Sequence, residues 1–319
     1  MKTIGVLTSG GDAPGMNAAV RAVVRTAISK GMTVKGIRRG YNGLIEGDII
    51  DLDIRSVSDI IHRGGTVLYT ARSPKFKTQE GVDEAVANCK KFGIEGIVVI
   101  GGDGSYRGAR DLSLNGIPCV GIPGTIDNDI SSTEYTIGFD TAMNTAMEMV
   151  DKLRDTTQSH DRCSVVEVMG RNAGHLALQC GIAVGATAIL VPELEYSLDD
   201  IIEKMRTSQK TGKQHFIIVV AEGVGGVDKI AKEIEEATGI ESRATVLGHV
   251  QRGGSPTVRD RVYATHFGYA AVQLLSKGIG NRVVGMQHGE IVDYDIYEAL
   301  NMKKPFDTEM FEVANITSI

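Results

Sequence analysis

The feature that most constrains the fold is a series of short, continuous apolar runs rich in β-branched residues. A helix-length amphipathic segment follows most of these runs. Strands of a parallel sheet are covered by helices on both faces, so their residues are apolar throughout instead of alternating with polar ones. Strands that alternate with helices are typical of an α/β fold with mainly parallel sheets. The predicted strands are residues 3–7, 96–100, 119–122, 163–168, 188–191 and 216–220.

The segments between these runs have the apolar spacing of amphipathic helices. In the first of them, apolar residues from Met16 to Ile28 recur three and four residues apart, and Gly31 follows where a helix often ends. The uncharged stretch 173–192 contains His175, Gln179 and three glycines, so we interpret it as a buried helix and a strand, not a membrane span. The other predicted helices are residues 79–92, 105–114, 142–154, 198–211, 227–238 and 260–276.

The length of 319 residues suggests about two domains. No proline-rich or low-complexity linker divides the chain. We therefore expect two interleaved domains, with the chain crossing between them more than once.

Charge and composition exclude several classes of function. The chain has 34 Lys and Arg against 40 Asp and Glu, and the resulting net charge of −6 argues against nucleic-acid or membrane partners. Tryptophan is absent and aromatic residues make up only 5%, which argues against stacking on bases. The four cysteines lie in apolar runs without C-x-x-C spacing, so we expect buried free thiols in a reducing compartment, the cytoplasm. They are Cys89, Cys119, Cys163 and Cys180.

Five predicted strands lead into loops of glycine and polar residues, where ligands of parallel sheets usually bind. The loop after the first strand contains Gly10, Gly11 and Gly15 and opens a helix, whose free N–H groups suit a phosphate. A tight turn without a ligand is the alternative, since neither G-x-G-x-x-G nor a Walker A motif is present. The five loops are VLTSGGDAPG (6–15), VVIGGDGS (98–105), VGIPGTIDND (120–129), VVEVMGRNAG (165–174) and VVAEGVGG (219–226).

Carboxylates in two of these loops suit phosphoryl chemistry. Asp103, flanked by glycines, could hold Mg²⁺ together with a nucleotide, or it could cap the next helix. Asp127 and Asp129 lie two residues apart. One carboxylate could accept a proton, while the other orients the first carboxylate or binds metal-bound water. Thr125 adds a hydroxyl for a phosphate oxygen, although an Asx-turn would explain the same loop without function.

Arginines complete the pattern. Guanidinium groups near strand ends and glycine loops suit bidentate recognition of phosphates, although each arginine alone is more often a surface residue. With the glycine loops and carboxylates, they indicate phosphoryl transfer, which depends on positioning and charge neutralisation. These arginines are Arg72, Arg162, Arg171, Arg243 and Arg252.

Five strings resemble bacterial ATP-dependent 6-phosphofructokinases over essentially the whole chain. They are SGGDAPGMN (9–17), GGDGS (101–105), PGTIDND (123–129), MGR (169–171) and LGHVQRGGSP (247–256). The resemblance implies two interleaved Rossmann-like domains, each with a mainly parallel sheet flanked by helices. Residues 1–138 with 252–302 would bind ATP, and residues 139–251 with 303–319 would bind fructose 6-phosphate. It also implies an allosteric, glycolytic homotetramer that uses MgATP to phosphorylate the C1 hydroxyl, giving fructose 1,6-bisphosphate.

The same resemblance assigns roles to residues. The catalytic set is Asp127 as the base, with Thr125, Arg171 and Asp129. Asp103 would be the magnesium ligand. The ATP-binding set is Gly11, Arg72, Ser73, Gly102, Asp103, Gly104 and Ser105, with Ser73 standing where close relatives often have cysteine. The sugar-phosphate set is Thr125, Ile126, Asp127, Arg162, Met169, Gly170, Arg171, Glu222, Arg243, His249 and Arg252, with Arg162 and Arg243 reaching the site of a neighbouring subunit.

Two alternative functions remain, and the predicted effector site departs from the family pattern. Pyrophosphate-dependent relatives carry aspartate at Gly104 and lysine at Gly124, so both glycines favour ATP. A non-catalytic sugar-phosphate or nucleotide sensor is the other alternative. The resemblance places effector-phosphate residues at Arg21, Arg25, Arg154 and Lys213. Three charged residues that the family usually has at this effector site are replaced here by Ile54, Thr187 and Thr211. We therefore expect weakened or re-tuned control by ADP and phosphoenolpyruvate.

Overall fold

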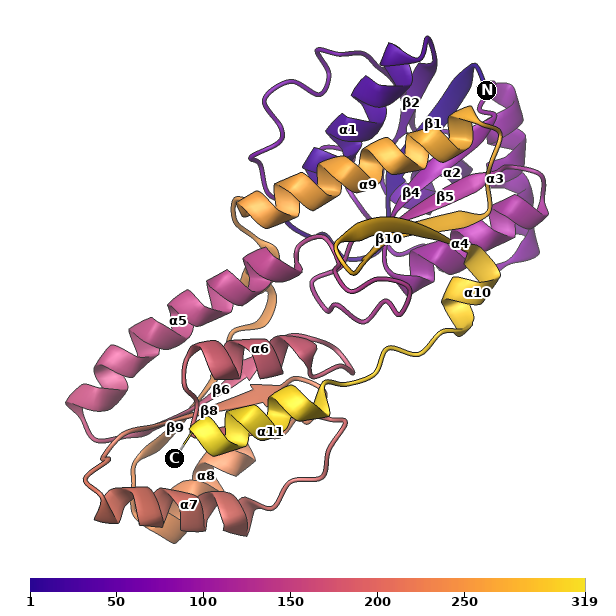
Figure 1. Cartoon of the computed structure of the whole chain (residues 1–319). Helices are drawn as coiled ribbons and strands as arrows, with labels where there is room; N and C mark the ends of the chain where they lie inside the picture. Colours follow the sequence, from indigo (N-terminus) through magenta and orange to yellow (C-terminus); the bar gives the residue numbers. More distant parts are fainter. Residues whose placement is uncertain (319) are drawn as a thin grey trace. The chain divides into compact units, whose positions relative to one another are not determined.

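The computed structural model describes residues 1–318, which divide into two compact units. The larger unit contains Met1–Ile126, Ile130–Thr141 and Arg252–Lys304. The smaller unit contains Asp127–Asp129, Ala142–Gln251 and the described residues from Pro305 onward. The chain passes between the units more than once, and the ligand expected for each domain stays a prediction. Figure 1 traces the chain through both units.

The larger unit is built on a seven-stranded sheet in the order β11-β10-β5-β4-β1-β2-β3. Its interior pairs are parallel, and the edge strands β3 and β11 pair antiparallel with their neighbours. The predicted strands 3–7, 96–100 and 119–122 are confirmed here. The strand bounds are β1 (Thr3–Thr8), β2 (Thr33–Ile37), β3 (Ile49–Leu52), β4 (Gly96–Gly101), β5 (Cys119–Pro123), β10 (Arg282–Gln287) and β11 (Glu290–Asp295).

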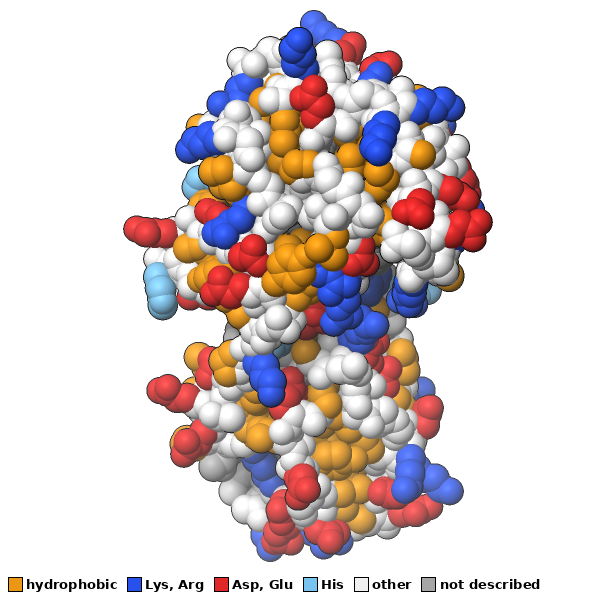
Figure 2. All heavy atoms as spheres, turned by 90° about the vertical axis from the view of Figure 1, so that its right-hand side faces the viewer, with side chains coloured by type: hydrophobic (Ala, Val, Ile, Leu, Met, Phe, Trp, Pro, Cys, Tyr) orange, Lys and Arg blue, Asp and Glu red, His pale blue; other side chains and the backbone are white. Residues whose placement is uncertain are grey.

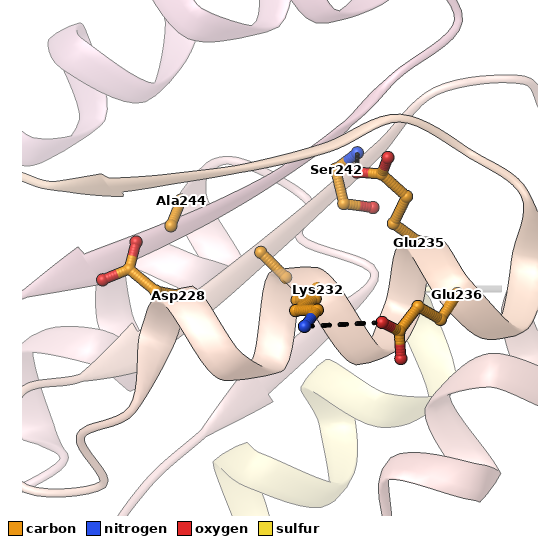
Figure 3. Close-up of a pocket in the computed structure, with 7 residues that line it drawn as sticks. Asp228, Lys232, Glu235, Glu236, Ser242 and Ala244 are labelled. Carbon is orange, nitrogen blue, oxygen red and sulfur yellow. Dashed lines mark hydrogen bonds and ion pairs between the residues drawn. The ribbon is translucent and has the colours of Figure 1, made fainter.

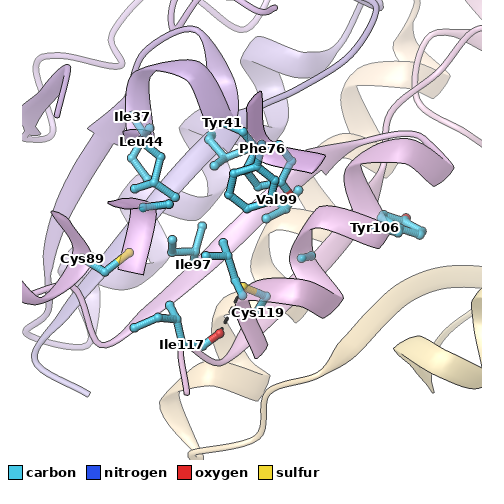
Figure 4. Close-up of a cluster of buried hydrophobic side chains, with 14 of the residues drawn as sticks. Ile37, Tyr41, Leu44, Phe76, Cys89, Ile97, Val99, Tyr106, Ile117 and Cys119 are labelled. Atoms are coloured by element: carbon cyan, nitrogen blue, oxygen red, sulfur yellow. Dashed lines mark hydrogen bonds between the residues drawn. The ribbon is translucent and has the colours of Figure 1, made fainter. Parts of the chain in front are cut away.

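Helices cover both faces of this sheet. Alternate side chains of a strand point to opposite faces, and Ile97 and Val99 of β4 pack into a cluster with Tyr41, Leu44 and Phe76 (Figure 4). The other face is covered by α1 and α9, which lie side by side in Figure 1. The helix bounds are α1 (Met16–Ser29), α2 (Gly40–Glu46), α3 (Gln79–Lys91), α4 (Asp103–Leu114), α9 (Val258–Ser276) and α10 (Ile296–Asn301), with a short 3₁₀ helix at Lys75–Lys77.

The smaller unit has a four-stranded parallel sheet in the order β7-β8-β6-β9. The predicted strands 163–168, 188–191 and 216–220 are confirmed as β6, β7 and β8, and the stretch 173–192 forms a helix and a strand as predicted. The strands are β6 (Cys163–Val168), β7 (Ala188–Leu190), β8 (Phe216–Ala221) and β9 (Ser242–Val246). The helices are α6 (His175–Ala183), α7 (Leu198–Lys210), α8 (Val227–Thr238) and α11 (Thr308–Thr317), with the 3₁₀ helix η2 at Gly248–Arg252.

Helix α5 (Phe139–Ser159) begins in the larger unit and continues in the smaller one. Its first turn is held by Asp260, a fully buried carboxylate of α9. That carboxylate accepts hydrogen bonds from the Tyr135 hydroxyl at 2.6 Å, the Gly138 N–H at 2.7 Å and the Thr141 N–H at 2.9 Å. The buried charge therefore fixes the start of α5 against α9 within the larger unit.

The four cysteines are free and buried, as predicted. Burial raises the pKa of the Cys89 thiol to about 12, so this thiol stays protonated at neutral pH. Acidic and basic side chains are interspersed over each unit on the face shown in Figure 2. Within residues 1–318, no helix has the length and apolar character needed to cross a bilayer.

Gly268 of α9 allows close packing against α1. A Cβ atom at position 268 would lie 2.7 Å from the Ala22 Cβ and 2.9 Å from the Ala19 carbonyl oxygen. We therefore expect Gly268→Ala to lower the free energy of unfolding by roughly 1–3 kcal/mol, because overpacking forces the two helices apart. Urea denaturation measures the change.

Gly104→Ala is the matched control, since a Cβ at this helical position meets no atom within 4 Å. Alanine should leave stability unchanged or raise it by up to about 1 kcal/mol through helix propensity. Equal stability of the two variants would contradict the packing argument.

Candidate active site

Three glycine loops of the larger unit meet at the carboxyl ends of neighbouring strands. The loops follow β1, β4 and β5, which are adjacent in the sheet. The Ser9 N–H donates to the Ile100 carbonyl at 3.0 Å, and the Gly124 N–H donates to the Gly101 carbonyl at 3.0 Å. The Ser105 hydroxyl donates to the Ser9 carbonyl at 3.1 Å. The sequence expectation that these loops lie together is consistent with this geometry.

Asp103 is the first residue of α4, and Gly102 precedes it as the N-cap without a side-chain hydrogen bond. The N-cap position, which was the alternative considered for Asp103, is thus occupied by Gly102. Next to it, Gly104 is exposed, and a Cβ there would meet open space. The Ser105 side chain is buried and holds the neighbouring loop, and its predicted contact with ATP stays a prediction.

Arg252 lies on the first glycine loop, a contact that sequence reasoning did not find. Its Nη1 donates to the Asp12 carbonyl at 3.1 Å. A Cβ at Gly11 would lie 2.5 Å from this nitrogen, so position 11 requires glycine while the arginine stays in place. Only the long-range fold brings these two segments together.

Arg72 is exposed near the same loop. Thr70, two residues earlier, donates from its hydroxyl to the Gly10 carbonyl at 2.9 Å and so ties this segment to the glycine loop. The Ser73 hydroxyl accepts from the Phe76 N–H at 3.3 Å. The predicted ATP-binding residues Gly11, Arg72, Gly102, Asp103 and Gly104 thus lie on segments that hydrogen bonds connect.

The PGTIDND segment follows β5 and is largely buried. Thr125, Asp127 and Asn128 are 8%, 6% and 7% exposed. Asn128 has a φ of 50°, so the chain turns sharply between the two aspartates. Thr125 belongs to the larger unit, whereas Asp127 and Asp129 belong to the smaller one. The segment therefore contributes polar groups to both units within a few residues.

In the smaller unit, the turn after β6 holds three of the predicted sugar-phosphate residues, and Glu222 bonds to this turn. The Arg171 N–H donates to the Glu222 carboxylate, and the Met169 N–H donates to the Gln251 side-chain oxygen at 3.3 Å. Arg171 has a φ of 58° and an exposed side chain, so its guanidinium is accessible at this turn. His249 is exposed on η2, which excludes the interior role considered for it.

The side chains of Gln251 and Glu222 accept hydrogen bonds from backbone N–H groups of this loop. Gln251 is fully buried and also donates from Nε2 to the Gly248 carbonyl at 3.0 Å, so it joins η2 to the Met169 loop. Gln251 was not among the predicted site residues. A buried amide inside an otherwise glycine-rich, polar motif was the available signal.

Arg162 and Arg243, which share one predicted role, lie close together in the smaller unit. Both form ion pairs with Glu241, whose carboxylate is 2.7 Å from the Arg162 Nε and 2.8 Å from the Arg243 Nη2. The close guanidinium groups, Arg162 first and then Arg243, hold the pKa of Glu241 below its usual range. Glu241 was not predicted, because its role depends on the pairing of β6 with β9.

Comparison with known proteins decides the family. The phosphofructokinase family model matches residues 3–275. An ATP-dependent 6-phosphofructokinase of Clostridium botulinum is 57% identical over 318 residues, covering all of both chains. The enzyme of the same name from Bacillus licheniformis is 58% identical, again over all of both chains. The chain belongs to the phosphofructokinase family.

Solved phosphofructokinases have the same fold. The chain covers 48% of a Saccharomyces cerevisiae phosphofructokinase chain, with 34% identity and a TM-score of 0.87. A pyrophosphate-dependent phosphofructokinase from Marinobacter aquaeolei superposes with a TM-score of 0.86 at 22% identity, a likeness of fold alone. The predicted fold class, two α/β Rossmann-like domains with sheets flanked by helices, is confirmed.

The residues predicted to bind effector phosphates fall into two clusters of positive charge, one in each unit. In the smaller unit, burial and then Arg154 lower the pKa of Lys213, and burial followed by Arg154 and Lys213 lowers that of His215. In the larger unit, burial and then Arg25 lower the pKa of Arg21. In each cluster, repulsion by a neighbouring cation adds to the effect of burial.

A pocket of about 470 Å³ between α8 and β9 is a separate feature (Figure 3). Its lining includes three carboxylates, Asp228, Glu235 and Glu236, against one cation, Lys232. That charge disfavours a phosphorylated ligand. None of the predicted site residues lines this pocket.

Proposed function

We propose that this chain is an ATP-dependent 6-phosphofructokinase that transfers the γ-phosphoryl group of ATP to the C1 hydroxyl of fructose 6-phosphate. The products are ADP and fructose 1,6-bisphosphate, in cytoplasmic glycolysis. One observation carries the proposal. Three glycine loops meet at neighbouring strand ends, in a chain 57% identical along its whole length to relatives of that name.

The larger unit supplies a surface for the nucleotide. Backbone N–H groups of glycine loops and the N-terminus of α4 favour phosphate oxygens. Gly11 and Gly102 permit a close approach, and Arg72 adds positive charge nearby. Arg252, which lies on the first loop, would couple nucleotide binding to the η2 segment.

The carboxylate of Asp103 is a suitable oxygen ligand for a magnesium ion that arrives with the nucleotide. Asp103 stands in the first turn of α4, beside the open space at Gly104. Within the described residues, no three His, Cys, Asp or Glu side chains form a metal cage. Magnesium commonly binds through one or two carboxylates together with phosphates, and Asp103 would hold it in that way. When bound, the ion neutralises charge on the phosphate groups.

Asp127 is the base in this proposal. It would accept the proton of the C1 hydroxyl as that oxygen attacks the γ-phosphorus and the bond to the ADP oxygen breaks. The carboxylate is 6% exposed, so it is shielded from bulk water. Thr125 and Arg171 would stabilise charge on the transferring phosphoryl group, and Asp129 would orient the Asp127 loop.

The smaller unit would bind the sugar phosphate. Met169 and Gly170 lie in the loop after β6, Glu222 follows β8 and bonds to that loop, and His249 lies on η2. Arg162 and Arg243 would reach the 6-phosphate bound to a neighbouring copy in a homotetramer. The active site of each chain would then depend on assembly.

Asp127→Ser should lower kcat by about 10²–10⁴-fold, because the proton acceptor is lost. Fructose 6-phosphate binding should remain within a few-fold, since no charge-assisted contact to the phosphate is removed. Coupled ADP release measures kcat, and calorimetric titration measures binding.

Asp129→Ser is the matched comparison for Asp127→Ser. It should lower kcat less, because Asp129 orients the loop without accepting the proton. Near-normal turnover of Asp127→Ser would remove this residue from the mechanism.

Two glycines make ATP the expected donor. A lysine at Gly124 would start from a Cβ only 3.1 Å from the Ile100 Cγ2 and from the Met16 Cε. At Gly104 there is room for a larger side chain, so Gly104→Asp should fold normally. Its carboxylate would repel the nucleotide phosphates and lower kcat/KM for ATP by about tenfold or more.

Rates with ATP and with pyrophosphate, at equal magnesium, test the choice of donor. Gly104→Ala controls for size and should have a smaller effect than Gly104→Asp. Comparable rates with the two donors in the unsubstituted enzyme would overturn the choice of ATP.

The cationic clusters would bind phosphorylated effectors, ADP and phosphoenolpyruvate, with altered strength. Thr187 is buried and supplies no charge, and the Thr211 hydroxyl donates to the Ser208 carbonyl at 2.8 Å. Ile54 is 49% exposed and also uncharged. Fewer charged partners mean a smaller difference in effector affinity between quaternary states, and only that difference can shift their populations.

We therefore expect weak responses of the fructose 6-phosphate saturation curve to ADP and phosphoenolpyruvate. Arg154→Ala should weaken them further, because it removes one cation of the cluster around Lys213. Strong activation and inhibition in the unsubstituted enzyme would contradict the expected change in control. An unaltered response in Arg154→Ala would contradict the assignment of the site.

A further inference from the structure

Glu241 connects two arginines across neighbouring strands of the smaller unit. β6 and β9 are parallel and pair Ser164 with Arg243. The backbone at Glu241 is fixed, because its carbonyl accepts from the Cys163 N–H at 2.9 Å. The Arg162 carbonyl accepts from the Phe216 N–H at 3.0 Å, so this residue is also anchored. All three side chains therefore start from rigid strand ends.

The Glu241 carboxylate contacts both guanidinium groups. Its Oε2 lies 2.7 Å from the Arg162 Nε, and its Oε1 accepts from the Arg243 Nε at 2.9 Å. The Arg162 side chain is 19% exposed, the Glu241 side chain 46%, and the Arg243 side chain 64%. Two neighbouring cations repel each other, and the carboxylate between them offsets that repulsion.

The contacts leave the outer edges of both arginines available. Glu241 takes the Nε edge of each guanidinium group. In the described part of the chain, neither Nη atom of Arg162 nor the Nη1 of Arg243 has a hydrogen-bond partner. A guanidinium group can bind two anions at once, one on each edge, so a phosphate could occupy the outer edges without displacing Glu241.

We propose that Glu241 is a positioning residue that holds Arg162 and Arg243 as a pair for the 6-phosphate of fructose 6-phosphate. This role deepens the proposed function and rests on it. Glu241 does not touch the substrate in this account. It fixes two long, flexible side chains before the ligand arrives, and such pre-organisation lowers the entropic cost of binding.

The alternative role for Glu241 is competition with the phosphate, and the two roles predict opposite effects of its removal. A carboxylate that competed with the phosphate for the arginines would weaken binding, and its removal would strengthen it. The free Nη edges favour positioning, because the two anions would use different edges of each guanidinium group.

Glu241→Gln is the direct test, since it keeps the size of the side chain and removes its charge. We expect KM for fructose 6-phosphate to rise about tenfold, with kcat and KM for ATP within twofold. Calorimetric titration with fructose 6-phosphate should show the same loss of affinity. Circular dichroism and the thermal midpoint check that the variant folds, which its exposed position favours.

Glu236→Gln is the matched control in the same unit. It removes one charge from α8, where Glu236 lies 3.7 Å from Lys232 and contacts neither arginine. Its KM for fructose 6-phosphate should equal that of the unsubstituted enzyme. A similar rise in both variants would mean that net charge, not positioning, sets the affinity.

A double-mutant cycle shows whether Glu241 acts through the arginines. In an Arg162→Ala/Arg243→Ala background, Glu241→Gln should change the binding constant for fructose 6-phosphate by less than twofold. An undiminished effect in that background, or an unchanged or lowered KM in Glu241→Gln alone, would overturn the proposal. If the unsubstituted enzyme bound fructose 6-phosphate without turning it over, the proposed function would fail, and the titrations would still decide the role of Glu241.

Discussion

The close approach of backbone segments at the ends of β1, β4 and β5 is the constraint on which the nucleotide half of the site depends. A Cβ atom at Gly101 would lie 2.5 Å from the Ser9 carbonyl oxygen. Only glycine lets these loops approach so closely, because a Cβ at position 101 would collide with the Ser9 backbone. At Gly11 the neighbour is the end of the Arg252 side chain, so glycine is needed there only while that arginine keeps its place. Glycine thus keeps side chains out of the surface proposed to bind the nucleotide.

In the smaller unit, polar side chains hold charged groups and a backbone turn in place. Glu222 and Gln251 bond to backbone N–H groups of the Met169–Arg171 turn, and Glu241 binds two arginines. The carboxylates and the amide therefore orient the groups that would meet the sugar phosphate. The chain joins this unit to the larger one through the PGTIDND segment, which carries Thr125 in one unit and Asp127 in the other.

The sequence predicted the central strands well, because buried parallel strands are continuous apolar runs. It missed β2 and β10 of the larger sheet. It also missed the edge strands β3 and β11, which are only partly buried, and β9, whose residues include Ser242 and the exposed Arg243. Co-location of the glycine loops followed from the rule that ligands bind at the carboxyl ends of parallel strands. The contacts of Arg252 with Asp12 and of Glu241 with Arg162 could not be predicted, because residues far apart in the chain make them. The roles of the site residues themselves stay predictions.

The central claim is that a nucleotide surface and a sugar-phosphate surface on one chain act together in a single phosphoryl transfer. ADP release by the unsubstituted enzyme from MgATP, compared among fructose 6-phosphate and other sugar phosphates, tests this claim most directly. The account predicts one ADP for each fructose 1,6-bisphosphate formed, and much slower release with the other sugar phosphates. Absence of ADP release with fructose 6-phosphate, or equal rates with every sugar phosphate, would contradict it.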